Sequence, residues 1–68
     1  MSLPYIREVY GVPAKRGARI RFDYPLGKDR PGPHEGTIVG ARGPHLNVRL
    51  DGERHTCSLH PTWRVEYL

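Results

Sequence analysis

The chain has 68 residues, room for a single domain (1–68), and eleven basic against seven acidic side chains give it a net charge of +4. A chain of this length buries only about 60% of the surface that its unfolded form exposes, so its core is thin. A single cysteine, Cys57, excludes an intrachain disulfide and favours a reducing, cytoplasmic setting. The sequence has no apolar run long enough to span a membrane and no signal-peptide pattern, so we expect no membrane contact.

Residues 2–11 predict a short N-terminal helix. Ser2 is a suitable N-cap, Pro4 is tolerated in the first turn, and Gly11 can adopt the left-handed conformation that closes a helix. The apolar residues recur at helical spacing on one face: Tyr5, Ile6, Val9 and Tyr10. A helix of about two turns is unstable alone, so we expect the first three of these residues to dock it on the rest of the domain.

After Pro13, apolar residues alternate with polar ones, a pattern typical of half-buried strands. The alternation predicts five strands, near residues 18–23, 37–41, 46–50, 53–59 and 63–67. Asp51-Gly52 favours a type I′ hairpin turn between the third and fourth strands, because this dipeptide readily supplies two positive φ angles. Residues 25–34 hold three prolines and two glycines, which exclude a regular element and predict a long loop.

Five short strands joined mostly by tight connections predict an all-β fold, a small five-stranded SH3-like barrel with a short N-terminal helix. The 25–34 segment corresponds to the long RT-type loop of such barrels, and its length is consistent with either a functional or a disordered loop. The inward phase of the alternation defines the expected core: Ile20, Phe22, Ile38, Leu46, Val48, Leu50, Leu59, Trp63 and Val65. Tyr24, at the mouth of the loop, is the aromatic residue that we expect to be exposed.

Two stretches, Gly17–Phe22 and Glu35–Val39, resemble the KOW-type SH3-like barrels of ribosomal and transcription-elongation proteins. In both, strand residues stand beside glycine and β-branched residues. The resemblance implies contact with RNA or with the transcription machinery. The whole chain also resembles short bacterial and prophage proteins, through the strings Tyr10–Gly17 and Leu59–Trp63, and this resemblance implies no particular function.

The C-terminal half is similar to the framework of the plasmid-borne type II dihydrofolate reductases, in the stretches 36–40, 58–61 and 65–66. The active surface of those enzymes carries a Val-Gln-Ile-Tyr run before a proline. The matching positions here are Cys57, Ser58, Leu59 and His60. Because the glutamine and tyrosine that hold the ligands are missing, the similarity supports the fold and argues against that activity.

The alternation that turns the core residues inward turns a set of arginines outward. With two basic residues of the 25–34 loop, they form the candidate nucleic-acid contacts: Arg19, Arg21, Lys28, Arg30, Arg49, Arg54 and Arg64. Guanidinium groups beside small hydroxyl and amide side chains suit phosphate contacts and are poor at reading base sequence. Acidic residues are sparse on the same strand faces, with Asp23 and Glu66 the clear cases. An ordinary solvated charged face is the competing interpretation.

The sequence gives little support for a metal or catalytic site. His55, Cys57 and His60 lie close together along the chain, but a structural zinc needs three or four ligands, usually paired at both ends of a loop. A Cys57–His60 pair has no evident third group to orient the base. We therefore expect no enzymatic activity, no metal and no cofactor.

The sequence predicts a non-enzymatic binding module of phage or mobile-element type, which binds DNA or RNA weakly and without sequence preference. The competing hypothesis is a protein-interaction module that docks on a host protein or complex through the N-terminal helix and the Pro-rich loop. Salt dependence discriminates the two, because phosphate contacts make affinity fall steeply with ionic strength. The oligomeric state and the choice between DNA and RNA do not follow from the sequence.

Overall fold

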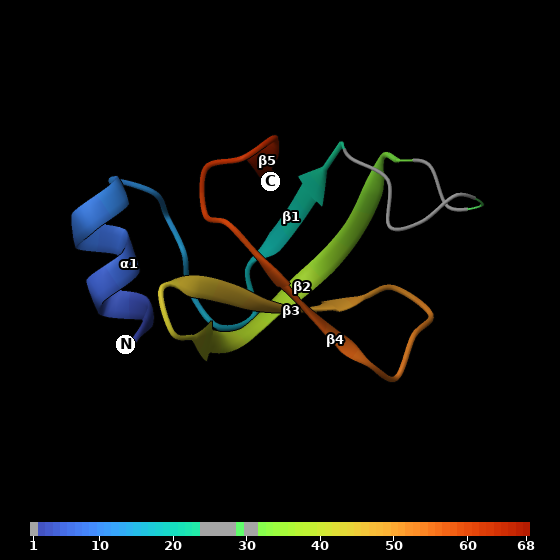
Figure 1. Cartoon of the computed structure of the whole chain (residues 1–68), viewed down its shortest axis with the longest axis horizontal. Helices are drawn as coiled ribbons and strands as arrows, with labels where there is room; N and C mark the ends of the chain where they lie inside the picture. Colours follow the sequence, from blue (N-terminus) through green and yellow to red (C-terminus); the bar gives the residue numbers. More distant parts are fainter. Residues whose placement is uncertain (1, 24–28, 30–31) are drawn as a thin grey trace.

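The computed structural model describes residues 2–23, 29 and 32–68 of the chain. A helix precedes five strands: α1 (Leu3–Tyr10), β1 (Arg19–Phe22), β2 (His34–Arg42), β3 (His45–Leu50), β4 (Thr56–Leu59) and β5 (Val65–Tyr67). The strands form one antiparallel sheet in the order β4-β3-β2-β1-β5, with β4 and β5 at its two edges (Figure 1). The expected β architecture with a short N-terminal helix is confirmed. The sheet itself is open, because no ladder joins β4 to β5.

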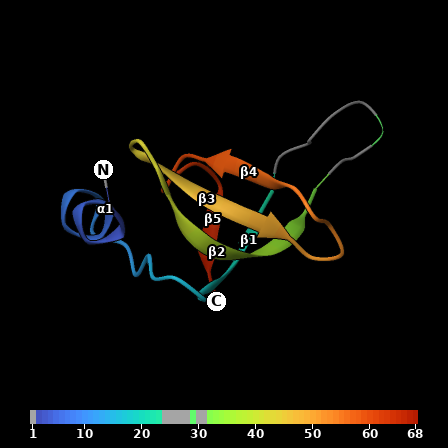
Figure 2. The same ribbon diagram turned by 90° about the horizontal axis from the view of Figure 1, so that it is seen from below.

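The ends of α1 are set by the expected residues. Ser2 is the N-cap, and its side chain accepts a hydrogen bond from the backbone N–H of Tyr5 at 3.5 Å. Gly11 closes the helix in the left-handed region, at φ 66°, and its N–H donates to the carbonyl of Arg7 at 2.9 Å. The helix lies at the end of the sheet that holds the β2–β3 turn, as two perpendicular views show (Figures 1 and 2).

The docking face of α1 differs from the expected one. Ile6 is fully buried, and Leu3 and Tyr10 are half-buried against the core, whereas Tyr5 is 42% exposed and Val9 53% exposed. The buried residues follow the spacing i, i+3, i+7, which is one stripe of a helix. Docking through Tyr5, Ile6 and Val9 is therefore right for Ile6 alone, because the other two lie roughly 90–130° round the helix axis from the centre of the buried stripe.

The core follows the expected alternation. The buried hydrophobic residues are Ile6, Ala14, Ile20, Phe22, Ile38, Leu46, Val48, Leu50 and Leu59. Seven of them were expected from the strand pattern, and Ile6 and Ala14 come from the helix and the segment after it. Arg7 joins these two parts, since its guanidinium donates to the carbonyl of Ala14 at 2.7 Å. Val65, also expected in the core, is half-buried against it.

Trp63 is the expected core residue that the structure places outside. It is 68% exposed, and β5 begins only at Val65. Between them Arg64 adopts a left-handed conformation, with φ 52°, so the alternation of β5 does not continue back to Trp63. Tyr67, on the inward phase of β5, is half-buried and its hydroxyl donates to the carbonyl of Pro61 at 2.7 Å.

The β3–β4 connection is longer than a two-residue hairpin. Gly52 has a positive φ of 79°, but Asp51 does not, so the expected type I′ turn is wrong. The Glu53 N–H donates to the Leu50 carbonyl at 3.1 Å, and β4 starts at Thr56 instead of near residue 53. Arg54 therefore lies in the connection, exposed, and not on a strand.

Most of the expected 25–34 loop, with Lys28, Arg30 and the neighbouring Tyr24, lies outside the described residues. The described chain resumes at Gly32, which is joined to the following proline by a cis peptide bond, and β2 begins two residues later at His34. Within the described residues, no helix is long and apolar enough to cross a membrane.

Candidate functional site

Side chains that alternate with the core project from the opposite face of the sheet, which we call the outer face. Antiparallel ladders place paired residues side by side on one face, so the register gives the order across the sheet from β4 to β5. That order is Thr56 and Ser58, then His45, Asn47 and Arg49, then Arg42, Thr37 and Glu35, then Arg19 and Arg21, and finally Glu66. Acidic and basic groups are unevenly distributed along it.

The β1 side of the outer face is an arginine–carboxylate cluster of Arg19, Arg21, Glu35, Asp51 and Glu66. The guanidinium of Arg19 donates to both carboxylate oxygens of Asp51, at 2.5 and 2.6 Å, and lies 3.6 Å from Glu35. Arg21 pairs with Glu35 at 3.4 Å and with Glu66 at 3.5 Å. Two guanidinium groups thus meet three carboxylates, so the cluster has a net charge of −1.

The bidentate pair has a clear electrostatic consequence. Hydrogen bonds from Arg19 stabilise the ionised carboxylate of Asp51 and lower its pKa below the ordinary value. The same hydrogen bonds, together with the charge of Asp51, raise the pKa of Arg19. Two of the candidate nucleic-acid contacts, Arg19 and Arg21, are therefore already occupied by carboxylates.

The expectation that acidic residues are sparse on this face is wrong for the cluster. Strand β2 begins at His34 and not at Thr37, which places Glu35 opposite Arg21 in the ladder. Asp51 belongs to the β3–β4 connection, yet its carboxylate reaches across to Arg19, 32 residues away in the sequence.

The other side of the outer face has a different composition, and we call it the basic face: Arg42, His45, Asn47, Arg49, Thr56 and Ser58. Arg42 and Arg49 are exposed, and no carboxylate of the described residues forms an ion pair with either one. The buried Oδ1 atom of Asn47 has no hydrogen-bond partner. The basic face ends near Arg49, because Arg49 lines a shallow hollow together with the acidic residues Asp51 and Glu53.

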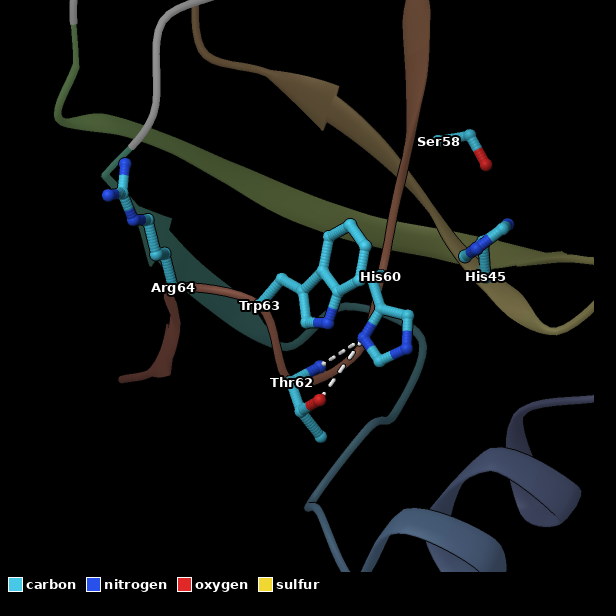
Figure 3. Close-up of a pocket in the computed structure, with 6 residues that line it drawn as sticks. All are labelled: His45, Ser58, His60, Thr62, Trp63 and Arg64. Atoms are coloured by element: carbon cyan, nitrogen blue, oxygen red, sulfur yellow. Dashed lines mark hydrogen bonds between the residues drawn. The ribbon is translucent and has the colours of Figure 1, made fainter.

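Beside the basic face, the chain between β4 and β5 forms an aromatic stack. The rings of His60 and Trp63 are stacked, with centroids 4.8 Å apart and planes 20° from parallel. The Nδ1 atom of His60 accepts a hydrogen bond from the backbone N–H of Thr62 at 3.1 Å, which fixes the plane of the imidazole ring (Figure 3). Tyr10, at the end of α1, meets the same ring edge-on at a centroid distance of 5.4 Å.

This stack lines an open pocket of about 840 Å³, which we call the Trp63 pocket. Its lining residues are His45, Ser58, His60, Thr62, Trp63 and Arg64, and none of these is acidic. His45 and Ser58 belong to the basic face, so the pocket and that face are continuous. In the close-up, Arg64 lies on one side of the indole and His45 and Ser58 lie on the other (Figure 3).

The indole of Trp63 is held but not covered. One ring face stacks on His60, and yet Trp63 is 68% exposed as a residue. The left-handed backbone of Arg64 directs the chain into β5, and its guanidinium donates to the carbonyl of Asp23 at 3.2 Å. Arg64 thus follows the exposed indole in the chain, and its guanidinium is held at the end of β1 by the carbonyl of Asp23.

The structure distributes the expected site residues over separate parts of the molecule. Arg19 and Arg21 belong to the arginine–carboxylate cluster, Arg49 to the basic face and Arg64 to the Trp63 pocket, whereas Arg54 stands in the β3–β4 connection. Lys28 and Arg30 lie outside the described residues.

Sequence reasoning missed two residues of the surface. Arg42 lies one residue beyond the strand expected at 37–41, yet it is the last residue of β2 and faces His45. Trp63 was assigned to the core. The break at 60–62 was the available signal for its exposure, because a turn resets the alternation that follows it.

His55, Cys57 and His60 do not form a metal site in the described part of the chain. His55 is exposed in the β3–β4 connection, while Cys57 is half-buried opposite Val48. No three His, Cys, Asp or Glu side chains of residues 2–23, 29 and 32–68 come close enough together to hold a metal ion.

Comparison of the chain with protein-family models, curated proteins and solved structures finds no match.

Proposed function

We propose that the protein is a small non-enzymatic binding module that contacts the phosphates of nucleic acid through the basic face. The supporting observation is the segregation of charge on the outer face. The basic face holds two arginines, Arg42 and Arg49, that form no ion pair with a carboxylate of the described residues, whereas the arginine–carboxylate cluster has a net charge of −1. Arg42 and Arg49, and not Arg19 and Arg21, are then the arginines that contact the phosphates. The setting is cytoplasmic, where nucleic acid is accessible.

The chemistry of the basic face suits phosphate oxygens. Guanidinium groups bind them with two donors in a plane, and hydroxyl and amide groups such as those of Asn47, Thr56 and Ser58 add single hydrogen bonds. Contacts of this kind fix the position of a nucleic acid without reading its sequence. We therefore expect weak binding, with a Kd of about 10⁻⁴–10⁻⁶ M at physiological salt.

The fold is part of the same proposal. The β2–β3–β4 meander and the pairing of β1 with β5 correspond to the strand order of SH3-like barrels, and the short 60–64 connection joins the two edge strands. We infer that the domain is a small open barrel of this type. Its curved outer face would then present Arg42 and Arg49 to a groove or to an extended strand.

The test compares two substitutions that remove the same charge from the same face of the sheet. Arg49→Gln should weaken binding to a labelled oligonucleotide and lower the slope of log K against log salt by about one. Arg21→Gln, within the arginine–carboxylate cluster, should change the slope by much less. Equal slopes for the two variants would show that only net charge matters, which contradicts a contact at the basic face.

A second candidate function rests on the exposed apolar pair Tyr5 and Val9 of α1, which are 42% and 53% exposed and lie one helical turn apart. Such a pair is a common anchor for a protein partner that packs on a helix. In that case the module would dock on a protein through α1, and its binding would depend little on salt. Tyr5→Ala combined with Val9→Ala would then abolish the capture of that partner and leave nucleic-acid binding unchanged.

A further inference from the structure

Trp63 is a costly residue to expose in a domain with so thin a core. Burial of an aromatic side chain is among the largest single contributions that a small domain can make to its stability. Here Trp63 is 68% exposed, and instead of packing inward its indole is stacked on His60. The imidazole is in turn held by Thr62 and by the ring of Tyr10. The result is a supported aromatic plane at the surface.

The residues around the exposed indole determine which kind of ligand can bind there. The residues that line the Trp63 pocket include no acidic one; beside Trp63 they are one arginine, Arg64, two histidines, and the hydroxyl-bearing Ser58 and Thr62. Such a lining favours a planar ring that carries hydrogen-bonding groups and a nearby negative charge. A nucleobase attached to its phosphate has all three properties.

The position of the pocket limits the form of the nucleic acid. The pocket continues into the basic face through His45 and Ser58, so a strand whose base enters the pocket can run on over Arg42 and Arg49. A base can stack on an indole only when it is free of its own neighbours, and extraction from a duplex costs a few kcal/mol. A single strand offers such a base at little cost.

We propose that the Trp63 pocket is a stacking site for one unpaired base of a single-stranded nucleic acid. The base lies against the indole of Trp63, and Arg64 faces the adjoining phosphate. The inference rests on the proposed function and deepens it: the basic face supplies attraction for any nucleic acid, whereas the pocket supplies the preference for single strands.

Trp63 is the only tryptophan of the chain, so its intrinsic fluorescence reports on the pocket directly. The titration uses unlabelled oligothymidylate and oligouridylate of about 12 nucleotides, within the site sizes usual for single-strand binding. A duplex of equal length is the comparison. Saturable quenching by either single strand at concentrations where the duplex gives little quenching supports the stacking site. The two single strands distinguish a DNA from an RNA preference.

Substitutions measured with labelled oligonucleotides provide the second arm. Trp63→Ala should weaken single-strand binding about 5- to 150-fold, the range of one lost base–aromatic stack, and leave duplex binding unchanged. Trp63→Phe should restore part of the affinity, since a phenyl ring also stacks. Tyr5→Ala is the matched control, because it removes another exposed aromatic ring that lies on α1 and outside the pocket. Thermal melts confirm that each variant is folded.

The failures of the two proposals are distinguishable. If neither single strands nor duplex bind at low salt, the proposed function is wrong, and the stacking site is wrong with it. If both bind equally and Trp63→Ala changes neither affinity, the stacking site is wrong while phosphate binding by the basic face stands. A loss of duplex and single-strand binding by the same factor in Trp63→Ala also contradicts a stacking site.

Discussion

Gly36 lies in β2 between Ile20 of β1 and Leu50 of β3, at a position without room for a side chain. A methyl group added there would be 2.6 Å from the carbonyl oxygen of Arg49 and 2.8 Å from the Cγ1 atom of Val48. The close contact with Arg49 is to backbone, so relief requires movement of the β2–β3 ladder itself. The substitution Gly36→Ala therefore tests the register that positions the basic face.

The expected magnitude follows from this geometry. Insertion of a methyl group into a filled core costs about 1–3 kcal/mol. A domain of this length has a total stability of about 3–10 kcal/mol, so the change is a large fraction of it. For small domains each kcal/mol shifts the Tm by about 4–8 °C, and Gly36→Ala should lower it by about 4–24 °C.

Gly40 supplies the matched control in the same strand. A methyl group added to Gly40 meets nothing within 4 Å. Gly40→Ala should leave the stability unchanged or raise it by about 0.4–1 kcal/mol, because it restricts the unfolded chain. Urea denaturation of the two variants and the wild type measures both effects. Equal stability of Gly36→Ala and the wild type, or equal losses in the two variants, would refute the β2–β3 register.

Four further substitutions test the helix and two ionisable groups. In thermal melts, Ile6→Ala should destabilise the fold by about 2–5 kcal/mol, and Val9→Ala by less than about 0.5 kcal/mol. The reverse order of the two losses would show that the helix docks by its other face. Burial raises the pKa of Tyr67 to about 12 from 10.0, so the wild type should lose stability as the pH rises from 10 towards 12, and Tyr67→Phe should lack this loss. Arg19 lowers the pKa of Asp51 below 3.8. The wild type should therefore be more stable than Asp51→Asn above this pH, and the difference should disappear as the pH falls further. A difference in stability that stays constant during acid denaturation would contradict the Arg19–Asp51 ion pair.

Local chemistry made several features of the fold predictable. Ser2 and Gly11 define the ends of the helix through capping, which depends on residues within one turn. The inward residues of β1 and β3 follow from simple alternation, and all of them are buried. Alternation fails where the backbone leaves the extended region, as at Arg64, and the prediction for Trp63 failed there.

The site depended on contacts that the sequence does not encode locally. The outward phases of Arg19, Arg21 and Arg49 were predictable from their strands. Their ion pairs were not, because Asp51 lies 32 residues from Arg19 and Glu66 lies 45 residues from Arg21. A short helix with two apolar faces also leaves its docking side undetermined, and packing against the core selected the side of Ile6.

The central claim is that nucleic acid binds across the basic face and the Trp63 pocket, and not on the arginines of β1. Chemical-shift mapping by heteronuclear NMR tests it most directly, since the chain has a mass of only 7.8 kDa. On addition of oligothymidylate at low salt, the account predicts shifts for the indole N–H of Trp63 and for the amides of β3 and β4. Shifts confined to β1 and β5, or no shifts at all, would contradict it.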